Sequence, residues 1–389
     1  MPVGCWATNY VDLFGADHAV GAVQLVATIT KALGGEVPSQ ATLLVAVEEL
    51  AAKDRPAALR RMTKDLLLDP AQRIQLDDVV SDEAGRVLAA MRDETRFPTQ
   101  NLAGSTQDEQ LVSLVTLATS YWRLVEPFCW SLQVAARFAA DTAALTPWTI
   151  ALRSVCAEAA RPKGGNTALL KLQYVPGLAA TFTAALACVG QARWDNLKTL
   201  LIDTTAPASP YSSQTSVPLV AAVHPWQAFG SELAPHVLAR TALTDEDPAA
   251  ALAGLLNRQF GKYHTPIAEW LHVVLRPIFA EQFRDDADYS HAFDRTEVIL
   301  GLLSQDQDAT VAAQNPDRSW ARGSTWFGRS TYRAARGSSN ALQEIQDELK
   351  GHALTWGPLQ AGLFGGVYQR AEQASDSYAE AFNDRTWRS

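Results

Sequence analysis

The sequence TQDEQLVSLVTLATSYWRLVEPFC, residues 106–129, carries the clearest structural signal in this chain. Thr106 and Glu109 have the spacing of a capping box, in which two side chains accept hydrogen bonds from the unpaired amides that begin a helix. Pro127 predicts a kink within the helix. Apolar side chains recur every three or four residues after the cap and so form one stripe: Leu111, Leu114, Val115, Ala118, Trp122, Val125 and Cys129.

The same helical periodicity extends along most of the chain. Alanine, leucine, glutamate and arginine dominate long stretches, and residues 39–53 and 56–67 predict two successive helices. Residues 167–190 predict a long apolar helix, and its stretch LAATFTAALACVG, residues 178–190, is apolar nearly all round, which places it at the centre of the core. Periodicity is poor near residues 319–334, which favours a short hairpin or an extended segment there. We therefore predict an all-α, multi-helix bundle-like array.

A polar segment rich in turn-forming residues, FPTQNLAGSTQ at 97–107, predicts a domain boundary. It separates an N-terminal helical region, residues 1–96, from a helical domain, residues 106–389. Residues 203–217 are rich in proline and serine, so we expect a mobile connection or a surface lid.

Composition predicts an ordinary cytoplasmic protein. The chain has 389 residues, a formal net charge of -9 and four cysteines, too few for a disulfide scaffold. Three of the cysteines lie in apolar runs and are expected to be buried. The N-terminus lacks a signal-peptide pattern, and we expect no membrane-spanning helix.

One basic segment departs from this acidic composition. Residues 317–336 hold five arginines against one acid, with four aromatic residues among them. Guanidinium groups bind anions, and aromatic faces bind flat rings or cations. The candidate residues for binding a partner or an anion are Arg322, Trp326, Arg329, Tyr332 and Arg333.

An internal role for these arginines stays open. Residues 245–308 carry twelve acidic and five basic residues, a net charge of -7, directly before the basic segment. The arginines could therefore dock on an acidic face of the same molecule. A nucleic-acid partner is disfavoured, because the sequence pI is near 5.3 and nucleic-acid binders present a large basic face.

Two constellations with catalytic or metal-binding residue types are incomplete. Glu269 and His272 form one Glu-x-x-His pair, whereas a di-iron bundle needs two pairs and further carboxylates. Ser290, His291 and Asp294 lie close in sequence, but side chains adjacent on a helix diverge, so no triad is expected. We predict no catalytic residues and no metal or cofactor.

One alternative is an enzyme. Asp285, Asp286 and Asp288 resemble the aspartate-rich magnesium motif of terpene synthases, which are helical enzymes acting on prenyl diphosphates. The second magnesium-binding triad of those enzymes is missing, and the acidic cluster is typical of a solvated loop. Neither a P-loop nor a dinucleotide-binding glycine motif occurs in the sequence.

Five short segments in a fixed order resemble the helical C-terminal region of multidomain bacterial antiphage defence proteins. Those proteins carry sirtuin-like or TIR-like effector domains, and the similarity covers about residues 105–375. The segments are LLKLQYVPGL (169–178), ARWDNL (192–197) with Leu200 and Leu201, HPW (224–226), WFGR (326–329) with Arg333, and GLFGG (362–366).

The resemblance implies a role in sensing or scaffolding. No effector domain is recognisable before residue 105, so it carries over no catalytic activity. The expected function is a non-enzymatic regulatory, sensor or scaffold subunit of an antiphage defence system. Such a subunit would bind a protein partner, an effector or a trigger, and homo-oligomerisation stays open.

Overall fold

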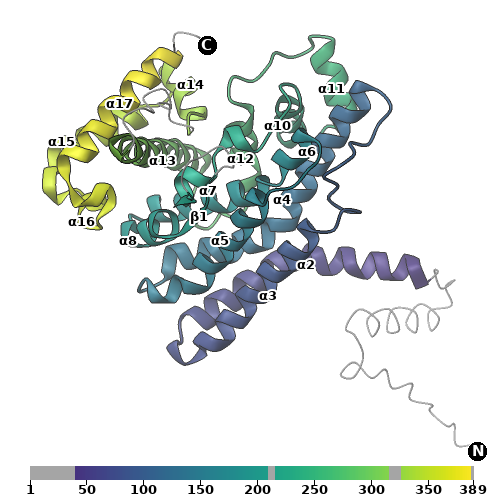
Figure 1. The fold of residues 1–389 in the computed structure, drawn as a ribbon, viewed down its shortest axis with the longest axis horizontal. Helices are drawn as coiled ribbons and strands as arrows, with labels where there is room; N and C mark the ends of the chain where they lie inside the picture. The colour runs from purple at the N-terminus through teal and green to yellow at the C-terminus, as the bar shows by residue number, and fades with distance from the viewer. Residues whose placement is uncertain (1–39, 209–214, 315–325, 387–389) are drawn as a thin grey trace, which may run out of the picture. The chain divides into compact units, whose positions relative to one another are not determined.

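The fold is all-α, as predicted, across the residues that this computed structural model describes: 40–208, 215–314 and 326–386 (Figure 1). Two compact units divide the chain, residues 1–59 and residues 60–389. The described part of the first unit is helical and belongs to α2 (Gln40–Leu67), which continues into the second unit. The two helices predicted at 39–53 and 56–67 are thus one helix, with Pro56 inside it. A proline removes one backbone hydrogen bond, and here the helix continues past it.

Helix α4 (Gln107–Phe138) begins at the predicted capping box. The Thr106 hydroxyl accepts a hydrogen bond from the amide of Glu109 at 3.2 Å, and the Glu109 carboxylate accepts one from the amide of Thr106 at 3.1 Å. Every residue of the predicted apolar stripe is buried. Pro127 lies inside the helix, which continues for eleven further residues to Phe138.

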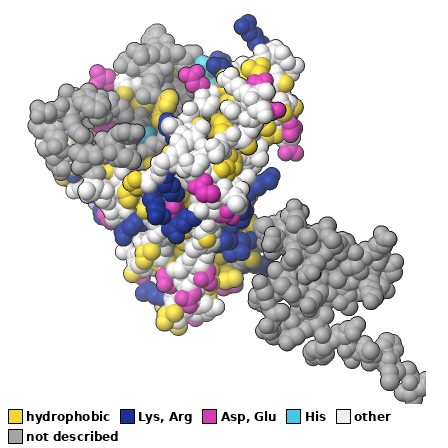
Figure 2. Space-filling view, turned by 45° about the vertical axis from the view of Figure 1, so that its right-hand side comes forward, with side chains coloured by type: hydrophobic (Ala, Val, Ile, Leu, Met, Phe, Trp, Pro, Cys, Tyr) yellow, Lys and Arg dark blue, Asp and Glu magenta, His cyan; other side chains and the backbone are white. Residues whose placement is uncertain are grey.

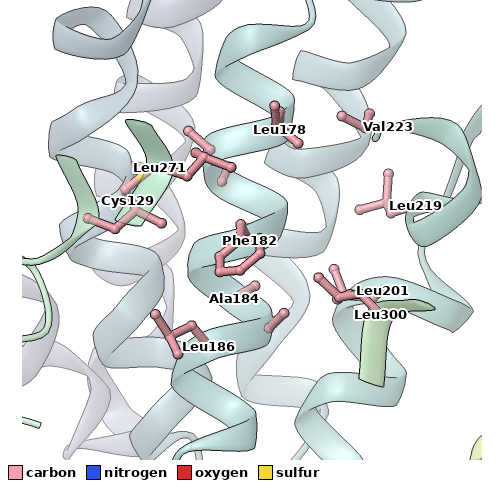
Figure 3. Close-up of a cluster of buried hydrophobic side chains, with 14 of the residues drawn as sticks. Cys129, Leu178, Phe182, Ala184, Leu186, Leu201, Leu219, Val223, Leu271 and Leu300 are labelled. Atoms are coloured by element: carbon pink, nitrogen blue, oxygen red, sulfur yellow. The ribbon is translucent and has the colours of Figure 1, made fainter. Parts of the chain in front are cut away.

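Helix α7 (Val175–Val189) is the centre of the core, and all of its side chains are buried. Figure 3 shows Leu178, Phe182 and Leu186 of α7 among apolar side chains from other elements. The predicted run 167–190 divides into α6 (Thr167–Leu172) and α7, because Pro176 has no amide hydrogen and therefore favours the first turn of a new helix.

The stretch Thr167–Val189 is long and apolar enough to cross a membrane, the one such stretch in the described chain. It is 94% buried inside the fold, as a core helix is. The three described cysteines, Cys129, Cys156 and Cys188, are free thiols buried as predicted.

Helices from both halves of the chain pack around α7. Those in direct contact with it include α4, α5 (Thr146–Ala160), α8 (Trp194–Lys198) and α13 (Asp286–Gln314). The remaining helices are α3 (Arg73–Met91), α9 (Leu219–Ala222), α10 (Ala234–Thr244), α11 (Pro248–Leu256), α12 (Pro266–Leu275), α14 (Arg329–Ala335), α15 (Ala341–His352), α16 (Gly357–Gln360) and α17 (Tyr368–Thr386).

The antiparallel strand pair of the described chain joins β1 (Thr205–Pro207) to β2 (Ser216–Pro218), within the proline- and serine-rich connection. The hairpin or extended segment predicted near 319–334 falls on residues of three kinds, of which 326–328 have no regular secondary structure. Residues 319–325 lie outside the described residues, and 329–335 form α14, whose start is stabilised by tertiary contacts that periodicity does not reveal.

The predicted division between residues 1–96 and 106–389 stays a prediction. Helix α3, which precedes the polar segment at 97–107, packs against α4 and α5, which follow it. Leu76, Val80 and Val87 of α3 belong to the same hydrophobic cluster as α7. Residues 60–96 therefore share the core of the larger unit.

Candidate functional site

Trp326 and Phe327 anchor the basic aromatic segment in the core. The Trp326 side chain is buried, and its indole Nε1 donates a hydrogen bond to the carbonyl of Val220 at 2.8 Å. The Phe327 ring stacks on Tyr378 with 4.8 Å between ring centroids. Of the predicted site residues, Trp326 is thus a core anchor, and Arg322 lies outside the described residues.

Arg329 and Arg333 dock on the acidic helices that precede them. The Arg329 guanidinium lies 3.2 Å from the Glu269 carboxylate on α12 and 3.5 Å from the Asp294 carboxylate on α13. Arg333 pairs with the second oxygen of Asp294 at 3.0 Å. The Arg329 and Asp294 side chains are only 13% and 2% exposed, so these guanidinium groups are used within the chain.

Glu297 caps the first turn of α14 from across the fold. Its carboxylate oxygens accept hydrogen bonds from the amides of Arg329 at 3.1 Å and Ser330 at 2.7 Å. This approach requires Gly328, because a Cβ there would overlap Glu297 Oε1 and lie 2.9 Å from the Cβ of Ala268. The start of α14 therefore depends on Glu297, which lies 31 positions earlier in the chain, and on the absence of a side chain at Gly328.

Burial dominates the electrostatics of this cluster. It raises the pKa of Glu269 and of Asp294 even though both face arginines. Burial and the charge of Asp294 together raise the pKa of Glu297 to about 8, although two backbone amides favour its ionised form. Burial, followed by repulsion from Arg329, lowers the pKa of His272 to about 3. The cluster joins α12, α13 and α14 through charges that water reaches poorly.

Tyr332 links α14 to the wall of a cavity. Its ring stacks on His264, with 4.4 Å between centroids and 18° between planes. The Arg336 guanidinium lies over the same tyrosine ring, 4.9 Å from its centroid. His264 lines the cavity, and so does Phe327 at the other end of the segment. Within the described part of the basic aromatic segment, Phe327 thus lines the cavity and Tyr332 packs against another lining residue, His264.

The cavity has a volume of about 510 Å³ and is partly open to solvent. Its walls come from α6, the turn at Pro225–Gln227, the start of α10, the loop before α12 and the start of α12. Trp226, Phe229 and Phe327 supply aromatic surface, and the Trp226 side chain is 60% exposed. Small-molecule sites are commonly apolar cavities of this size with a few convergent polar groups.

Basic side chains also line the cavity, although the protein is acidic. Lys171 and Lys262 contribute ammonium groups, and neither forms an ion pair with a described carboxylate. Glu232, an exposed residue, is the one carboxylate among the described lining residues. Elsewhere, Figure 2 shows basic and acidic side chains interspersed over the described part of one face. The lysines make the cavity locally positive.

The positive charge of these lysines also lowers the pKa of two nearby histidines, His236 and His224. Burial lowers the pKa of His236, and Lys262 lowers it further. His236 Nδ1 accepts a hydrogen bond from the amide of Tyr263 at 3.1 Å, so the neutral ring carries its proton on Nε2. Burial, followed by repulsion from Lys171, lowers the pKa of His224 to about 4.

Helix α12 begins at the cavity without a side-chain cap. Thr265 occupies the N-cap position but makes no capping hydrogen bond, and its hydroxyl is buried with no partner among the described residues. Ile267 and Ala268, in the first turn, both line the cavity. The first amides of a helix have no partner within it and favour negative charge nearby.

The remaining sequence candidates have other contacts. Ser290 Oγ lies 3.0 Å from His272 Nε2, a pairing not visible in the sequence, and the low pKa of this imidazole makes it a weak base. His291 contacts Glu344 at 2.7 Å, whereas Asp294 binds the arginines.

The aspartate-rich motif lies at the start of α13. Asp285 accepts a hydrogen bond from the amide of Asp288 at 2.8 Å, and Asp286 pairs with Arg276 at 2.7 Å. Within the described residues, no group of three or more histidine, cysteine or acidic side chains is placed to hold a metal ion.

No family model, curated protein or solved structure matches this chain.

Sequence reasoning missed the cavity as a site. Lys171 and Lys262 are far apart in the chain, and Lys262 belongs to none of the segments singled out in the sequence, so only the fold places both lysines at one cavity. A signal was nevertheless present in the segments that carry the resemblance. Lys171, Pro225 with Trp226, and Phe327 come from three of them, and all line this cavity.

Proposed function

We propose that this chain is a non-enzymatic, cytoplasmic recognition subunit of a bacterial antiphage defence system. In this proposal the cavity between α6, α10 and α12 captures the trigger or the part of a partner that activates the system. The subunit then acts as a sensor or scaffold for a separately encoded effector.

The observation that carries the proposal is that three of the five resembling segments contribute residues to one cavity. Lys171, Trp226 and Phe327 belong to segments that span more than 150 residues of sequence, and they line one cavity. A recurrent set of residues that meets at an open cavity is better explained by binding than by packing alone. The cavity lysines have no carboxylate partner among the described residues, whereas Arg329 and Arg333 are paired within the fold.

The rigid support behind the cavity is consistent with recognition. Phe327 reaches the cavity from a segment whose next residues are bound by Glu297, Glu269 and Asp294. A wall supported by buried ion pairs and stacked rings keeps its shape, which reduces the entropy lost on binding.

A phage-plating assay tests the proposal. The chain would be expressed with the genes that flank it in its own genome, and plaque formation would be compared with an empty vector. The variant Lys171→Gln/Lys262→Gln removes both cavity charges while nearly preserving side-chain shape, so we expect it to lose protection. The matched control Arg284→Gln/Lys350→Gln removes two exposed charges that do not line the cavity, so it should protect as the wild type does.

Protection by the cavity variant at the wild-type level would contradict the proposal. So would the failure of the wild-type chain and its neighbours to reduce plaque formation. Thermal unfolding followed by circular dichroism would check that both variants retain the wild-type fold.

A further inference from the structure

A second cavity, which we call the α3 groove, has mostly apolar walls. It lies between the end of α2, the start of α3, the end of α4 and the start of α5, and its volume is about 350 Å³. An apolar cavity of about 150 Å³ holds one benzene ring, so the α3 groove has room for about two large apolar side chains. The apolar side chains of its walls include Leu67, Leu68, Leu76, Phe138 and Pro147.

The two most exposed large apolar side chains of the described residues lie at this groove. Leu68, in its wall, is 81% exposed, and Ile74, in the first turn of α3, is 79% exposed. Ile74 lies one turn before Asp77, which lines the groove, so the two are neighbours on the surface of α3. Phe138 is half-exposed, and the Arg137 guanidinium lies over its ring. Single exposed apolar side chains are ordinary, whereas several around one groove mark an interaction surface.

The unpaired charge beside the groove is negative. Asp77 lines the groove, and Asp78 and Asp82 continue from it along α3. All three aspartates are exposed, and none of them forms an ion pair with a described residue. Complementary charge at an interface speeds association and selects the partner, so these aspartates favour lysine or arginine on whatever enters the groove.

Two basic side chains close to the apolar residues already have partners. Arg73 is the one basic side chain among the described lining residues, and it pairs with Asp141 at 3.3 Å. Lys64, one turn before Leu68, pairs with Glu281 at 3.1 Å. These two basic groups are therefore neutralised within the chain, and the α3 aspartates are not.

The walls of the groove indicate the form of the partner. The described lining residues belong to helices and to the turns between them, and none belongs to a strand that a peptide could extend. An extended peptide would leave most of its amides and carbonyls unpaired against apolar side chains, which is costly. A helix pairs these groups internally, and apolar grooves between helices bind the apolar face of an amphipathic helix.

A second copy of this chain fits the groove less well. In a dimer with two-fold symmetry the same surface of each copy meets itself. The aspartates of α3 would then be brought close to those of the other copy, and like charges across an interface oppose association.

From these observations we infer that the α3 groove binds a basic amphipathic helix of a partner protein. Apolar side chains of that helix enter the groove beside Leu68 and Phe138, and its lysines or arginines face the aspartates of α3. The proposed function supplies one such partner, the separately encoded effector. The binding surface stands without that function, because the groove shares no lining residue with the cavity between α6, α10 and α12.

Fluorescence anisotropy of labelled peptides with the full chain tests this inference. The probe is a peptide of about 18 residues, long enough to form a helix, with leucine at every third or fourth position and lysine and alanine between them. A second peptide has the same composition in scrambled order, and a third has glutamate in place of lysine. We expect the probe to bind at least about tenfold more tightly than either, because only the probe combines an apolar face with positive charge.

Substitutions at the groove test where the probe binds. Leu68→Gln/Ile74→Gln removes apolar surface and should weaken binding of the probe by at least about tenfold. Both side chains are exposed, so we expect the fold to be retained. The matched control Leu256→Gln/Leu354→Gln changes two exposed leucines that do not line the groove, and it should bind the probe as the wild type does.

A charge variant tests the role of the aspartates. Asp77→Asn/Asp78→Asn should weaken binding of the probe by about fivefold and make it less sensitive to salt, because it removes charges that face the lysines of the probe.

Three results would overturn the inference. The scrambled peptide could bind as tightly as the probe, or Leu68→Gln/Ile74→Gln could bind the probe as the wild type does. The third is a dimer, measured by analytical ultracentrifugation without peptide, that Leu68→Gln/Ile74→Gln dissociates. That result would assign the groove to a second copy of the chain.

Discussion

At the scale of single residues, Arg329 and Arg333 of the basic segment are internal contacts. Three carboxylates, Glu269, Asp294 and Glu297, face Arg329, Arg333 and the first amides of α14. The sequence indicated this possibility through the acidic stretch at 245–308, but it did not identify which acids would pair. Ion pairs depend on distance and burial, and neither can be read from composition.

Arg329→Ala should lower the free energy of unfolding by about 3 kcal/mol, because it leaves buried carboxylates with less compensation. Arg336→Ala is the matched control. Arg336 lies over the ring of Tyr332 at an exposed position, so its loss should cost less than about 1 kcal/mol. Urea denaturation of both variants measures the difference. Equal stability of the two variants would contradict the docking role of Arg329.

At the scale of elements, some helices begin where the local sequence dictates, and others begin where a contact with a distant residue stabilises the first turn. The start of α4 is encoded within four residues, and the structure confirms its capping box. The start of helix α14 depends on a distant residue, because its first amides donate hydrogen bonds to Glu297 of α13. Residues 319–334 therefore lack a helical pattern, although 329–335 are helical.

Gly328→Ala should destabilise the protein by roughly 2–4 kcal/mol, because the added Cβ overlaps the Glu297 carboxylate and separates α14 from α13. Gly351→Ala changes the same residue type within α15, where a Cβ meets nothing within 4 Å. Alanine favours a helix more than glycine does, so this control should raise stability by up to about 1 kcal/mol. Thermal unfolding reports both effects, and a shift of the same sign in the two variants would argue against the close approach of α14.

At the scale of the whole molecule, the buried cluster makes stability depend on pH. The native state holds a proton on Glu297 up to about pH 8, whereas the unfolded chain releases it near pH 4.5. The stability that this group contributes is complete below about pH 4.5 and is lost as pH rises through 8. Asp308, whose pKa burial raises to about 7, acts in the same direction.

Glu297→Gln should therefore flatten the fall in the free energy of unfolding between pH 6.5 and 8.5. This window avoids His224 and His272, whose lowered pKa values make stability increase with pH only below about 6.5. The slopes of the free energy of unfolding against pH should be compared and not its absolute values. Glutamine also loses one of the two backbone hydrogen bonds at the start of α14, which lowers stability at every pH. Urea denaturation at several pH values measures them, and parallel slopes for the variant and the wild type would show that Glu297 does not titrate in this range.

By itself, the sequence determined the all-α class, the capped start of α4 and the central place of residues 175–189, because capping and apolar periodicity act within a few residues. It also marked Arg329 and Arg333 as unusual. Only the tertiary structure decided that these arginines face inward and that Lys171 and Lys262 line a cavity with Trp226. These contacts join residues that are far apart in the chain, and their charges and cavities exist only after the helices have packed around α7.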